Sequence, residues 1–142
     1  MQGGITIRHY KPSDYPAVIE VWNQTDLGGA QRGDNQAIIE HSIAMGGCML
    51  IAETNDGTVV GTSWMTFDGR RIHLHHIGVK PDFQRKGIGR MLTEQSINFD
   101  KVKGYQIKLE VHKNNIVAVR LYKKLGFKYL GDYDVYIIRS FD

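Results

Sequence analysis

The amino-acid sequence predicts a single α+β domain over residues 1–142, and three observations carry that prediction. Segments of alternating apolar residues, typical of strands, are interspersed with longer segments whose apolar residues recur at helical spacing. The turns Asn55-Asp56-Gly57 and Asp68-Gly69 separate neighbouring strand-like segments, as in the hairpins of an antiparallel sheet. The composition, 42% hydrophobic and 23% charged, is ordinary for a globular domain with one core.

The first half of the chain is expected to form two helices and four strands. Ser13 is a suitable N-cap for the first helix, whose apolar residues Val18 and Trp22 fall on one face. A Gly-Gly pair at 46–47 ends the second helix, and the glycine-rich, polar residues 23–35 form the loop between the helices. The expected elements are a strand at 5–8, a helix over 12–22, a helix over 36–45, and strands at 48–54, 59–67 and 71–79.

The second half alternates helices with strands and is expected to end in a hairpin. Ile107, Leu109 and Val111 alternate with polar residues, which is typical of a strand with one apolar face. The expected elements are a helix over 88–102, a strand at 106–111, a helix over 115–125 closed by Gly126, and two hairpin strands at 127–130 and 133–138.

The most informative segment joins the strand that ends at Val79 to the helix that begins at Ile88. Gly87 and Gly89 lack a Cβ atom, so backbone N–H groups there can approach a ligand closely. The first N–H groups of a helix have no partners within the helix and carry partial positive charge. The basic residues around them are Arg85, Lys86 and Arg90. We therefore expect an anion site, and a pyrophosphate fits it best, although the pattern is neither a P-loop nor a three-glycine dinucleotide fingerprint.

Charge is unevenly distributed along the chain. Residues 1–71 carry 5 basic and 8 acidic side chains, and residues 72–142 carry 13 and 7, which gives the net charge of +3. A basic half favours either nucleic acid or a small polyanion. Aromatic residues do not alternate with the basic ones as on a base-stacking surface, so we expect a small polyanion and no nucleic acid. No apolar run reaches the ~18 residues of a membrane span, so no membrane partner is expected.

Cysteine usage favours a reducing compartment. Cys48 is the only cysteine, so no internal disulfide can form, and its apolar neighbours indicate a small core residue. Residues 1–5 have neither the basic start nor the long apolar stretch of a secretion signal. We therefore expect a cytoplasmic protein.

Two segments resemble the GNAT (Gcn5-related N-acetyltransferase) superfamily. Gln84, Gly87 and Gly89 occupy the defining positions of its acyl-CoA signature, Q/R-x-x-G-x-G/A, after a strand that ends in Val. The segment from Asn115 to Phe127 is similar to the family's N-x-x-A-x-x-L-Y-x-x-x-G-F pattern. The order of the expected elements is also that of the family and covers the whole chain.

The resemblance implies a fold, a cosubstrate and a set of binding residues. The fold is a central, mixed, mostly antiparallel twisted sheet with about four flanking helices, splayed where acetyl-CoA binds. The backbone N–H of Ile77 is the implied oxyanion donor, and Asn115 is implied to bond the pantetheine arm, with an N-cap as its alternative role. A monomer or homodimer without a metal is expected. The positions implied to bind acetyl-CoA are Ile77, Val79, Gln84, Arg85, Lys86, Gly87, Ile88, Gly89, Arg90, Asn115 and Tyr122.

Glu110 is the first candidate for the base that an amine acceptor needs. The apolar residues of the expected strand 106–111 point to the other face, so Glu110 faces the same way as Lys108. Glu110 followed by Asn115 and Tyr122 resembles the ribosomal-protein-alanine N-acetyltransferases, in which the matching glutamate is the base. The alternative is a solvated glutamate paired with Lys108.

His73 and His75 are the second candidate. Two residues apart on a strand, they are expected to share a face with Ile77 and Val79, with His76 on the opposite face as a structural residue. The string His-Leu-His-His-Ile-Gly-Val resembles the H-L-H-x-L-A-V of serotonin N-acetyltransferase, whose two histidines relay the proton. Histidine titrates near neutral pH, which suits that role. The alternative is a pair of polar strand residues beside an open site.

Tyr122 is the candidate acid, because the family's tyrosine at this position lies near the sulfur of CoA. A phenol of pKa about 10 can protonate a thiolate of pKa about 8.5 at little cost. The alternative is a core aromatic residue. Loop 23–35 is where the family usually builds its acceptor pocket, and its candidate contacts are Trp22, Asp26, Arg32 and Asp34.

These observations predict an N-acetyltransferase that acetylates a primary amine with acetyl-CoA, by direct attack in a ternary complex. The acceptor is either a small molecule or a protein N-terminus. The alternative from another class is a regulatory module that binds CoA without turnover. Such a module would need neither a base nor an acid, so Glu110, His73, His75 and Tyr122 favour the enzyme.

Overall fold

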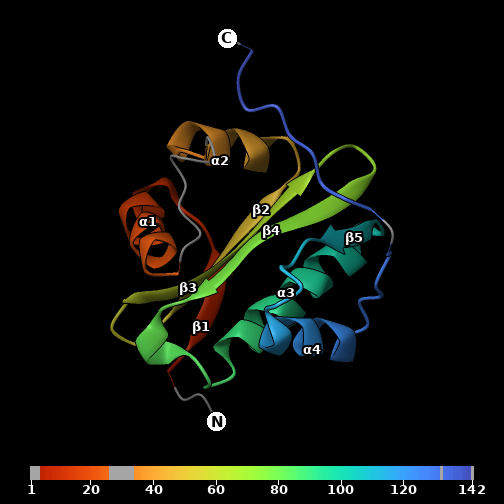
Figure 1. The fold of residues 1–142 in the computed structure, drawn as a ribbon. Coiled ribbons are helices and arrows are strands. Elements are labelled where there is room, and N and C mark those ends of the chain that lie inside the picture. The colour runs from red at the N-terminus through yellow and green to blue at the C-terminus, as the bar shows by residue number, and fades with distance from the viewer. Residues whose placement is uncertain (1–3, 26–33, 132, 142) are drawn as a thin grey trace. The chain divides into compact units, whose positions relative to one another are not determined.

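The computed structural model describes residues 4–25, 34–131 and 133–141, which fall into two compact units, 1–110 and 111–142. Each unit is described by itself. In the described part of the first unit, five strands form one sheet in the order β1-β2-β3-β4-β5 (Figure 1). The strands are β1 (Thr6–His9), β2 (Cys48–Glu53), β3 (Val59–Phe67), β4 (Arg71–Val79) and β5 (Gln106–Leu109). Pairing is antiparallel from β1 to β4 and parallel between β4 and β5, so the mixed, mostly antiparallel sheet is confirmed.

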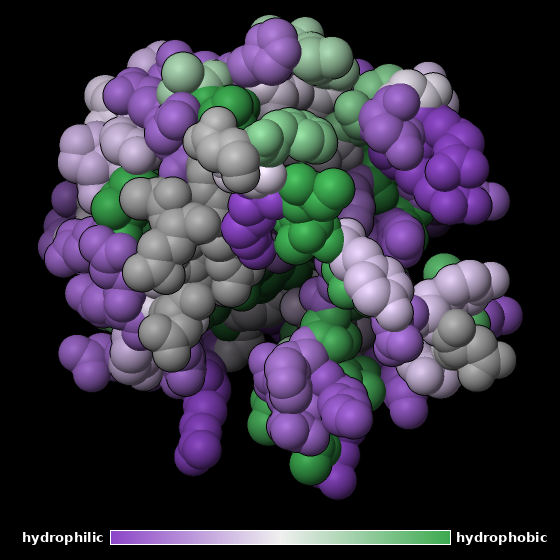
Figure 2. Space-filling model, turned by 45° about the horizontal axis from the view of Figure 1, so that its top comes forward, coloured by the Kyte–Doolittle hydropathy of each residue, from purple (hydrophilic) through white to green (hydrophobic). Residues whose placement is uncertain are grey.

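Three α-helices of the first unit cover the two faces of this sheet. The helices are α1 (Tyr15–Gln24), α2 (Gln36–Ala44) and α3 (Ile88–Lys103), with short 3-10 helices at Pro12–Asp14 and Pro81–Phe83. Helices α1 and α2 lie on one side of the sheet and α3 on the other (Figure 1). No helix in the described ranges is long and apolar enough to cross a membrane. Figure 2 shows a face on which hydrophilic side chains predominate, with hydrophobic patches between them.

The core under α1 and α2 is built around two tryptophans. Trp22 is fully buried, and its ring stacks on Trp64 with centroids 5.7 Å apart. The Trp22 indole N–H donates to Thr62 Oγ1 at 3.0 Å, and the Trp64 indole N–H donates to Ser42 Oγ at 3.0 Å. Both polar atoms of this aromatic core are therefore satisfied, as burial requires.

Helix α3 packs closely on the opposite face. A Cβ atom at Gly61 would lie 3.0 Å from Leu92 Cδ1 and 3.1 Å from the Gly78 carbonyl, so the close approach of helix and strand depends on glycine. The Ser63 and Ser96 hydroxyls are 2.7 Å apart beneath the helix. These contacts fix α3, and with it the turn that precedes the helix, against the end of β4.

A β-bulge in β4 changes the facing of its histidines. The pairing passes from Trp64–His76 directly to Met65–Leu74, so His75 is an extra residue in β4. An extra residue reverses the alternation of side chains along the rest of the strand. The three neighbouring histidines of β4 consequently gather on the face that α1 and α2 cover.

The parallel pairing between β4 and β5 covers only the first part of β4. It ends at Leu74–Leu109, whereas β4 continues to Val79. The second half of β4 therefore has no partner on the β5 side among the described residues. Because β5 itself ends there, the splay expected at the acetyl-CoA site stays a prediction.

The second unit contains α4 (Ile116–Lys124), which begins at Asn115 as expected. The predicted terminal hairpin is wrong: the described residues from 127 to 138 form no strand. A two-stranded hairpin is marginal without a third strand or a helix to cover it, and this unit supplies no third strand in its described ranges. Alternation of Tyr133, Val135 and Ile137 is therefore insufficient to form one.

Candidate active site

The turn before α3 presents unbonded backbone N–H groups. The first hydrogen bond of the helix runs from the Met91 N–H to the Gly87 carbonyl at 3.0 Å. The N–H groups of Ile88, Gly89 and Arg90 therefore have no acceptor within the helix. Gly87, with φ of 85°, occupies the left-handed region, and no side chain caps the helix. The Ile88 side chain is buried in the core, so this residue can serve a ligand only through its backbone.

The first turn of α3 leaves room for a ligand. A Cβ atom at Gly89 would meet only Val79 Cγ2, at an ordinary 3.9 Å, so packing does not require glycine there. Arg90 is exposed, and its Nε atom lies 3.3 Å from Glu94 Oε2 on the next turn. Open space, free N–H groups and the positive end of the helix together fit a phosphate or pyrophosphate group.

The loop that leads to this turn is tied to β4. The Gln84 side-chain amide donates to the Val79 carbonyl at 2.9 Å, so Gln84 fixes the loop to the end of the strand. Arg85 has φ of 63°, an uncommon conformation for a residue other than glycine. Its guanidinium and the Lys86 ammonium are exposed, and Lys86 Nζ lies 5.5 Å from the centre of the Phe83 ring. Both cations are thus available to an anion at the helix.

The predicted facing of His73 and His75 is wrong, whereas His76 does lie on the face opposite Ile77 and Val79, as expected. Ile77 pairs with Ser63 and Val79 with Gly61, which lie on the α3 face. His73 pairs with Thr66 and His76 with Trp64, which lie on the α1 and α2 face. The bulge at His75 is the physical reason, because one extra residue moves a side chain to the other side of the sheet.

The three histidines form a cluster with their neighbours. The His73 and His75 rings stack with centroids 4.3 Å apart and planes 5° from parallel. His75 Nε2 lies 2.7 Å from Thr66 Oγ1. His76 is buried, its ring edge contacts Trp22 at 4.8 Å, and its Nε2 lies 3.1 Å from an Asp34 carboxylate oxygen. The structural role predicted for His76 agrees with these contacts.

The surroundings of His73 and His75 favour the neutral, proton-accepting form of both rings. Burial among neighbouring groups, and then the charges of His73 and His76, lower the pKa of His75 to about 4, although part of the residue is exposed. Burial also lowers the pKa of His73, while the carboxylate of Glu110 opposes that shift. Both imidazoles are consequently neutral at pH 7.

Glu110 directly follows β5, which ends at Leu109, two residues earlier than the expected strand 106–111. Lys108 pairs with His73 across the two strands, and Glu110 lies two residues further along. Among the charges that act on His73, that of Glu110 has the largest effect. The two candidate bases predicted from separate motifs are therefore neighbours in space.

The remaining predicted residues divide between the two units and the loop. In the second unit, the Asn115 side chain caps α4 by accepting the Ala118 N–H at 3.3 Å. The Tyr122 ring contacts Phe127 at 5.7 Å, and burial raises the pKa of its phenol, which keeps the proton on it. Trp22 is a core residue and Asp34 pairs with His76, whereas Asp26 and Arg32 lie outside the described residues.

The sequence patterns did not point to two of the groups in the histidine cluster, Thr66 and Trp64, which belong to β3. Asp34, a candidate from loop 23–35, reaches His76 from far along the chain. The strand register pairs Thr66 with His73 and Trp64 with His76. Predicting two neighbouring strands does not give this register unless the position of the bulge is also known.

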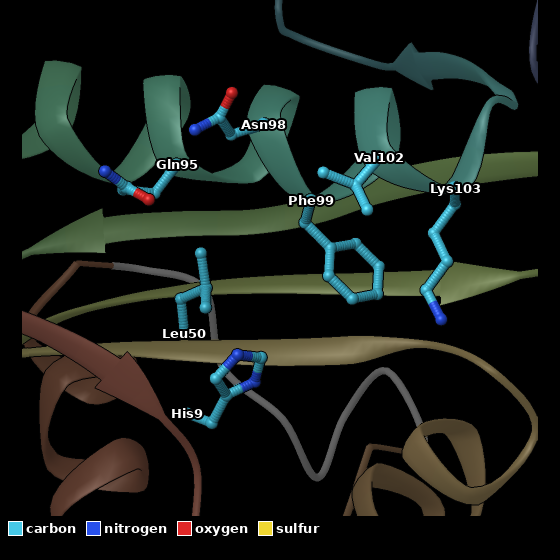
Figure 3. A pocket seen from close by; sticks show the side chains of 7 residues that line it. All are labelled: His9, Leu50, Gln95, Asn98, Phe99, Val102 and Lys103. Carbon is cyan, nitrogen blue, oxygen red and sulfur yellow. The ribbon is translucent and has the colours of Figure 1, made fainter.

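A pocket of about 260 Å³ lies away from this site, between α3 and the edge of the sheet (Figure 3). His9 pairs with Leu50, which pairs with Ser63, so this pocket is on the α3 face and not on the face of the histidines. It is lined by His9, Leu50, Gln95, Asn98, Phe99, Val102 and Lys103. The α3 residues among these begin at Gln95, about two turns into the helix, so the pocket is also separate from the turn at Gly87.

Comparison with known proteins identifies the class and then the family. The fold is shared with solved acetyltransferase structures. The ribosomal-protein-S18-alanine N-acetyltransferase of Escherichia coli is 25% identical, with a TM-score of 0.75, over 87% of this chain and 77% of that one. The yncA protein of Salmonella typhimurium, solved with acetyl-CoA, is 26% identical, with a TM-score of 0.78, over 91% and 82%. AAC(6')-Iy, solved with the bisubstrate analogue CoA-S-monomethyl-acetylneamine, shares the fold at 17% identity, with a TM-score of 0.75, over 96% and 99%.

A model of the acetyltransferase (GNAT) family matches residues 15–127, and the chain belongs to that family. The resemblance found in the two sequence motifs is thereby confirmed. The protein is an N-acetyltransferase, and acetyl-CoA is its cosubstrate. The open, positively charged turn before α3 fits the anionic part of that molecule.

Proposed function

We propose that this enzyme transfers the acetyl group of acetyl-CoA to a primary amine by direct attack in a ternary complex. The observation that carries the proposal is the gathering of Glu110, His73 and His75 on one face of the sheet. They lie beside the point where β4 and β5 stop pairing, and a proton acceptor at that place is what amine acetylation requires.

The acceptor sets how much a base matters. An amine must be neutral to attack, and the pKa of a lysine-type amine is about 10.4, against about 7.7–8.0 for an α-amine. At pH 7 a lysine-type amine is almost entirely protonated, so it needs a nearby base more than an α-amine does. The neutral imidazoles of β4 and the exposed carboxylate of Glu110 are the groups available to take that proton.

Acetyl-CoA supplies the acetyl group as a thioester. In the proposal, the N–H groups of the first α3 turn and the cations Arg85, Lys86 and Arg90 hold its anionic part. The backbone N–H of Ile77 stabilises the oxyanion, and Tyr122 donates a proton to the departing thiolate. Asn115 contacts the pantetheine arm in addition to its role as a cap.

Direct attack is favoured over an acetylated enzyme by the state of the only cysteine. Cys48 is 2% exposed, and burial raises the pKa of its thiol to about 11. A thiol of that pKa provides almost no thiolate at neutral pH, and the thiolate is the nucleophile. An acetyl-cysteine intermediate would therefore lack its nucleophile.

Relatives support both kinds of primary amine acceptor. One solved neighbour is a ribosomal-protein-S18-alanine N-acetyltransferase, and another was solved with a CoA–acetylneamine bisubstrate analogue. Against the protein acceptor, residues 133–137 read Tyr-Asp-Val-Tyr-Ile and do not resemble the R-x-x-Y-Y-like segment of the ribosomal enzymes. A small-molecule primary amine is the acceptor that we favour.

An amine panel tests the proposed function. Purified protein and acetyl-CoA are mixed with small mono- and diamines, amino sugars, and peptides with a free N-terminus, and release of the CoA thiol is followed. We expect amine-dependent thiol release for at least one compound and a matching mass gain on that amine. Thiol release no faster than in the amine-free control, from protein that binds acetyl-CoA in calorimetry, would support the non-catalytic module instead.

A further inference from the structure

We propose that Glu110 and His73 act as one base, in which His73 takes the proton of the acceptor amine and Glu110 stabilises the imidazolium. The inference rests on the proposed function and deepens it, since the two residues stand as alternatives in the sequence motifs. Thr66 and His75 are positioning residues in this arrangement, because they act through the His73 ring.

The strand register brings the two groups together. His73 is opposite Lys108 in the parallel β4–β5 ladder, and Glu110 follows two residues later, after the ladder has ended. Residues two apart in an extended chain point to the same side, so Glu110 leaves β5 on the face that carries His73. The carboxylate is the strongest charge acting on that imidazole, and its effect stabilises the protonated ring.

Stacking excludes a relay through both histidines. The His73 and His75 rings are 5° from parallel with centroids 4.3 Å apart. The N–H bonds and lone pairs of imidazole lie in the ring plane, so neither stacked ring can pass a proton directly to the other. Two positive rings at this distance would also repel each other, so the stack holds at most one proton near neutral pH.

His73 is the ring that carries that proton. One nitrogen of His75 is engaged with the Thr66 hydroxyl at 2.7 Å, and the pKa of His75 is about 4. His75 is therefore a fixed, neutral platform beneath His73. The contact with Thr66 fixes the His75 ring, and the bulge places His75 on the same face as His73.

The charged and titratable groups around His73 come from three elements. They are Glu110 and Lys108 at β5, Asp68 in the turn between β3 and β4, and His75 on β4 itself. The carboxylates raise the pKa of His73 and Lys108 lowers it. Glu110 and Lys108 thus shift the pKa of His73 in opposite directions. Replacing each of them by glutamine gives two variants whose expected effects have opposite sign.

The protons and bonds of the proposed step balance. The acceptor ammonium first gives one proton to His73, which becomes an imidazolium beside the Glu110 carboxylate. The neutral amine then forms the C–N bond at the acetyl carbonyl while the C–S bond breaks. Tyr122 gives its proton to the departing sulfur, which becomes a thiol, the second amine proton restores the Tyr122 phenol, and His73 returns its proton to solvent. No oxidant or reductant takes part.

Histidine titration by NMR tests the pairing without substrates. The His73 Cε1–H signal is assigned as the one lost in His73→Gln and is then titrated in wild type, Glu110→Gln and Lys108→Gln. We expect Glu110→Gln to lower the pKa of His73 by about 0.5–1 unit, the lower end of what a neighbouring carboxylate produces. Lys108→Gln should raise it. A His73 pKa that neither variant moves would overturn the pairing.

The kinetic arm asks whether the paired group is the base. With an amine from the panel, the acidic limb of the kcat/KM profile should move in Glu110→Gln to the same lower pH as the His73 signal, and His73→Gln should abolish it. If His73→Gln keeps the limb and Glu110→Gln loses it, Glu110 alone is the base and the proposal is wrong. The titration needs no turnover. If no amine of the panel is acetylated, the proposed function is refuted, whereas the titration still shows whether Glu110 and His73 are paired.

Thr66→Val provides the positioning control. Removing the hydroxyl should change the His75 titration and lower kcat more than it raises KM, while Thr66→Ser, which keeps the hydroxyl, should restore both. If Thr66→Ser behaves like Thr66→Val, the loss reflects packing in β3, and Thr66 has no positioning role.

Discussion

Gly89 stands in the first turn of α3, although neither its backbone conformation nor its contacts with the described residues require a glycine there. Its backbone is not in the left-handed region, and a Cβ atom would touch only Val79 Cγ2 at 3.9 Å. Gly87 differs, because its φ of 85° favours glycine for conformational reasons. The space at Gly89 is therefore better explained by a ligand than by the fold.

A methyl group at Gly89 separates these two explanations. Gly89→Ala should stabilise the fold by about 0.5 kcal/mol, because alanine loses less backbone freedom in a helix. It should also weaken acetyl-CoA about tenfold, or ~1.4 kcal/mol, by obstructing the N–H groups. Thermal unfolding and calorimetric titration measure the two effects. Unchanged affinity in the stabilised variant would place the pyrophosphate elsewhere.

Tyr122 is half-buried, and its surroundings raise the pKa of its phenol, which keeps it protonated at neutral pH, as a proton donor must be. Tyr122→Phe removes one hydroxyl and little volume. We expect kcat to fall about 10²-fold, the usual scale of a lost general acid, with acetyl-CoA affinity nearly unchanged. Turnover at the wild-type rate would show that Tyr122 is only a packing partner of Phe127.

Individual residues were predicted well where a single local rule determined them. Asn115 caps α4, Gly87 opens α3 and Cys48 is a core residue, and each follows from side-chain chemistry within a few positions. Ser13 was expected to cap the first helix, yet Asp14 is the residue with partners there. It accepts from the Lys11 N–H at 2.7 Å and pairs with Arg8 at 2.8 Å. Rules based on neighbouring residues cannot predict such a partner, because Arg8 belongs to another element, β1.

At the scale of elements, the bulge in β4 decides which side chains meet in the histidine cluster. If β4 were regular, with His75 paired like its neighbours, alternation would place His73 and His76 on opposite faces. With it, the three imidazoles share one face with Thr66 and Trp64. The sequence predicts the strand and its length but not the bulge, because a bulge depends on how the partner strand is aligned.

The histidine stack should make the fold sensitive to acid. Unfolded histidine has a pKa near 6.5, whereas the folded values of His73 and His75 are lowered, the latter to about 4. As the pH falls below 6.5, the unfolded state binds protons that the folded state does not, so stability falls towards pH 4. Partial exposure of His75 screens the effect.

Urea unfolding at pH 7 and pH 5 measures this loss. We expect His75→Gln to lose less stability between the two pH values than wild type does, because the variant lacks a histidine whose pKa is lowered on folding. His41→Gln, at an exposed position of α2, is the control and should keep the wild-type difference. Equal losses in all three proteins would show that the stack does not drive the acid sensitivity.

At the scale of the molecule, the order of elements was predictable up to α4 and the terminal hairpin was not. Strands β1 to β4 each have an antiparallel neighbour close in sequence or a buried apolar face. Their sequences therefore show a clear pattern of apolar residues from which the strands can be predicted. The segment from 127 to 138 has a strand pattern but no described partner. The single domain over 1–142 stays a prediction, which one cooperative unfolding transition of the whole chain would support.

The chain belongs to an acetyltransferase family, and we propose that acetyl transfer to the amine is direct and takes place at the end of the β4–β5 ladder. Initial rates with both acetyl-CoA and the best amine of the panel varied test this most directly. We expect intersecting double-reciprocal lines, since a ternary complex must form and buried Cys48 offers no nucleophile. Parallel lines, together with an acetylated enzyme trapped in the absence of amine, would contradict it.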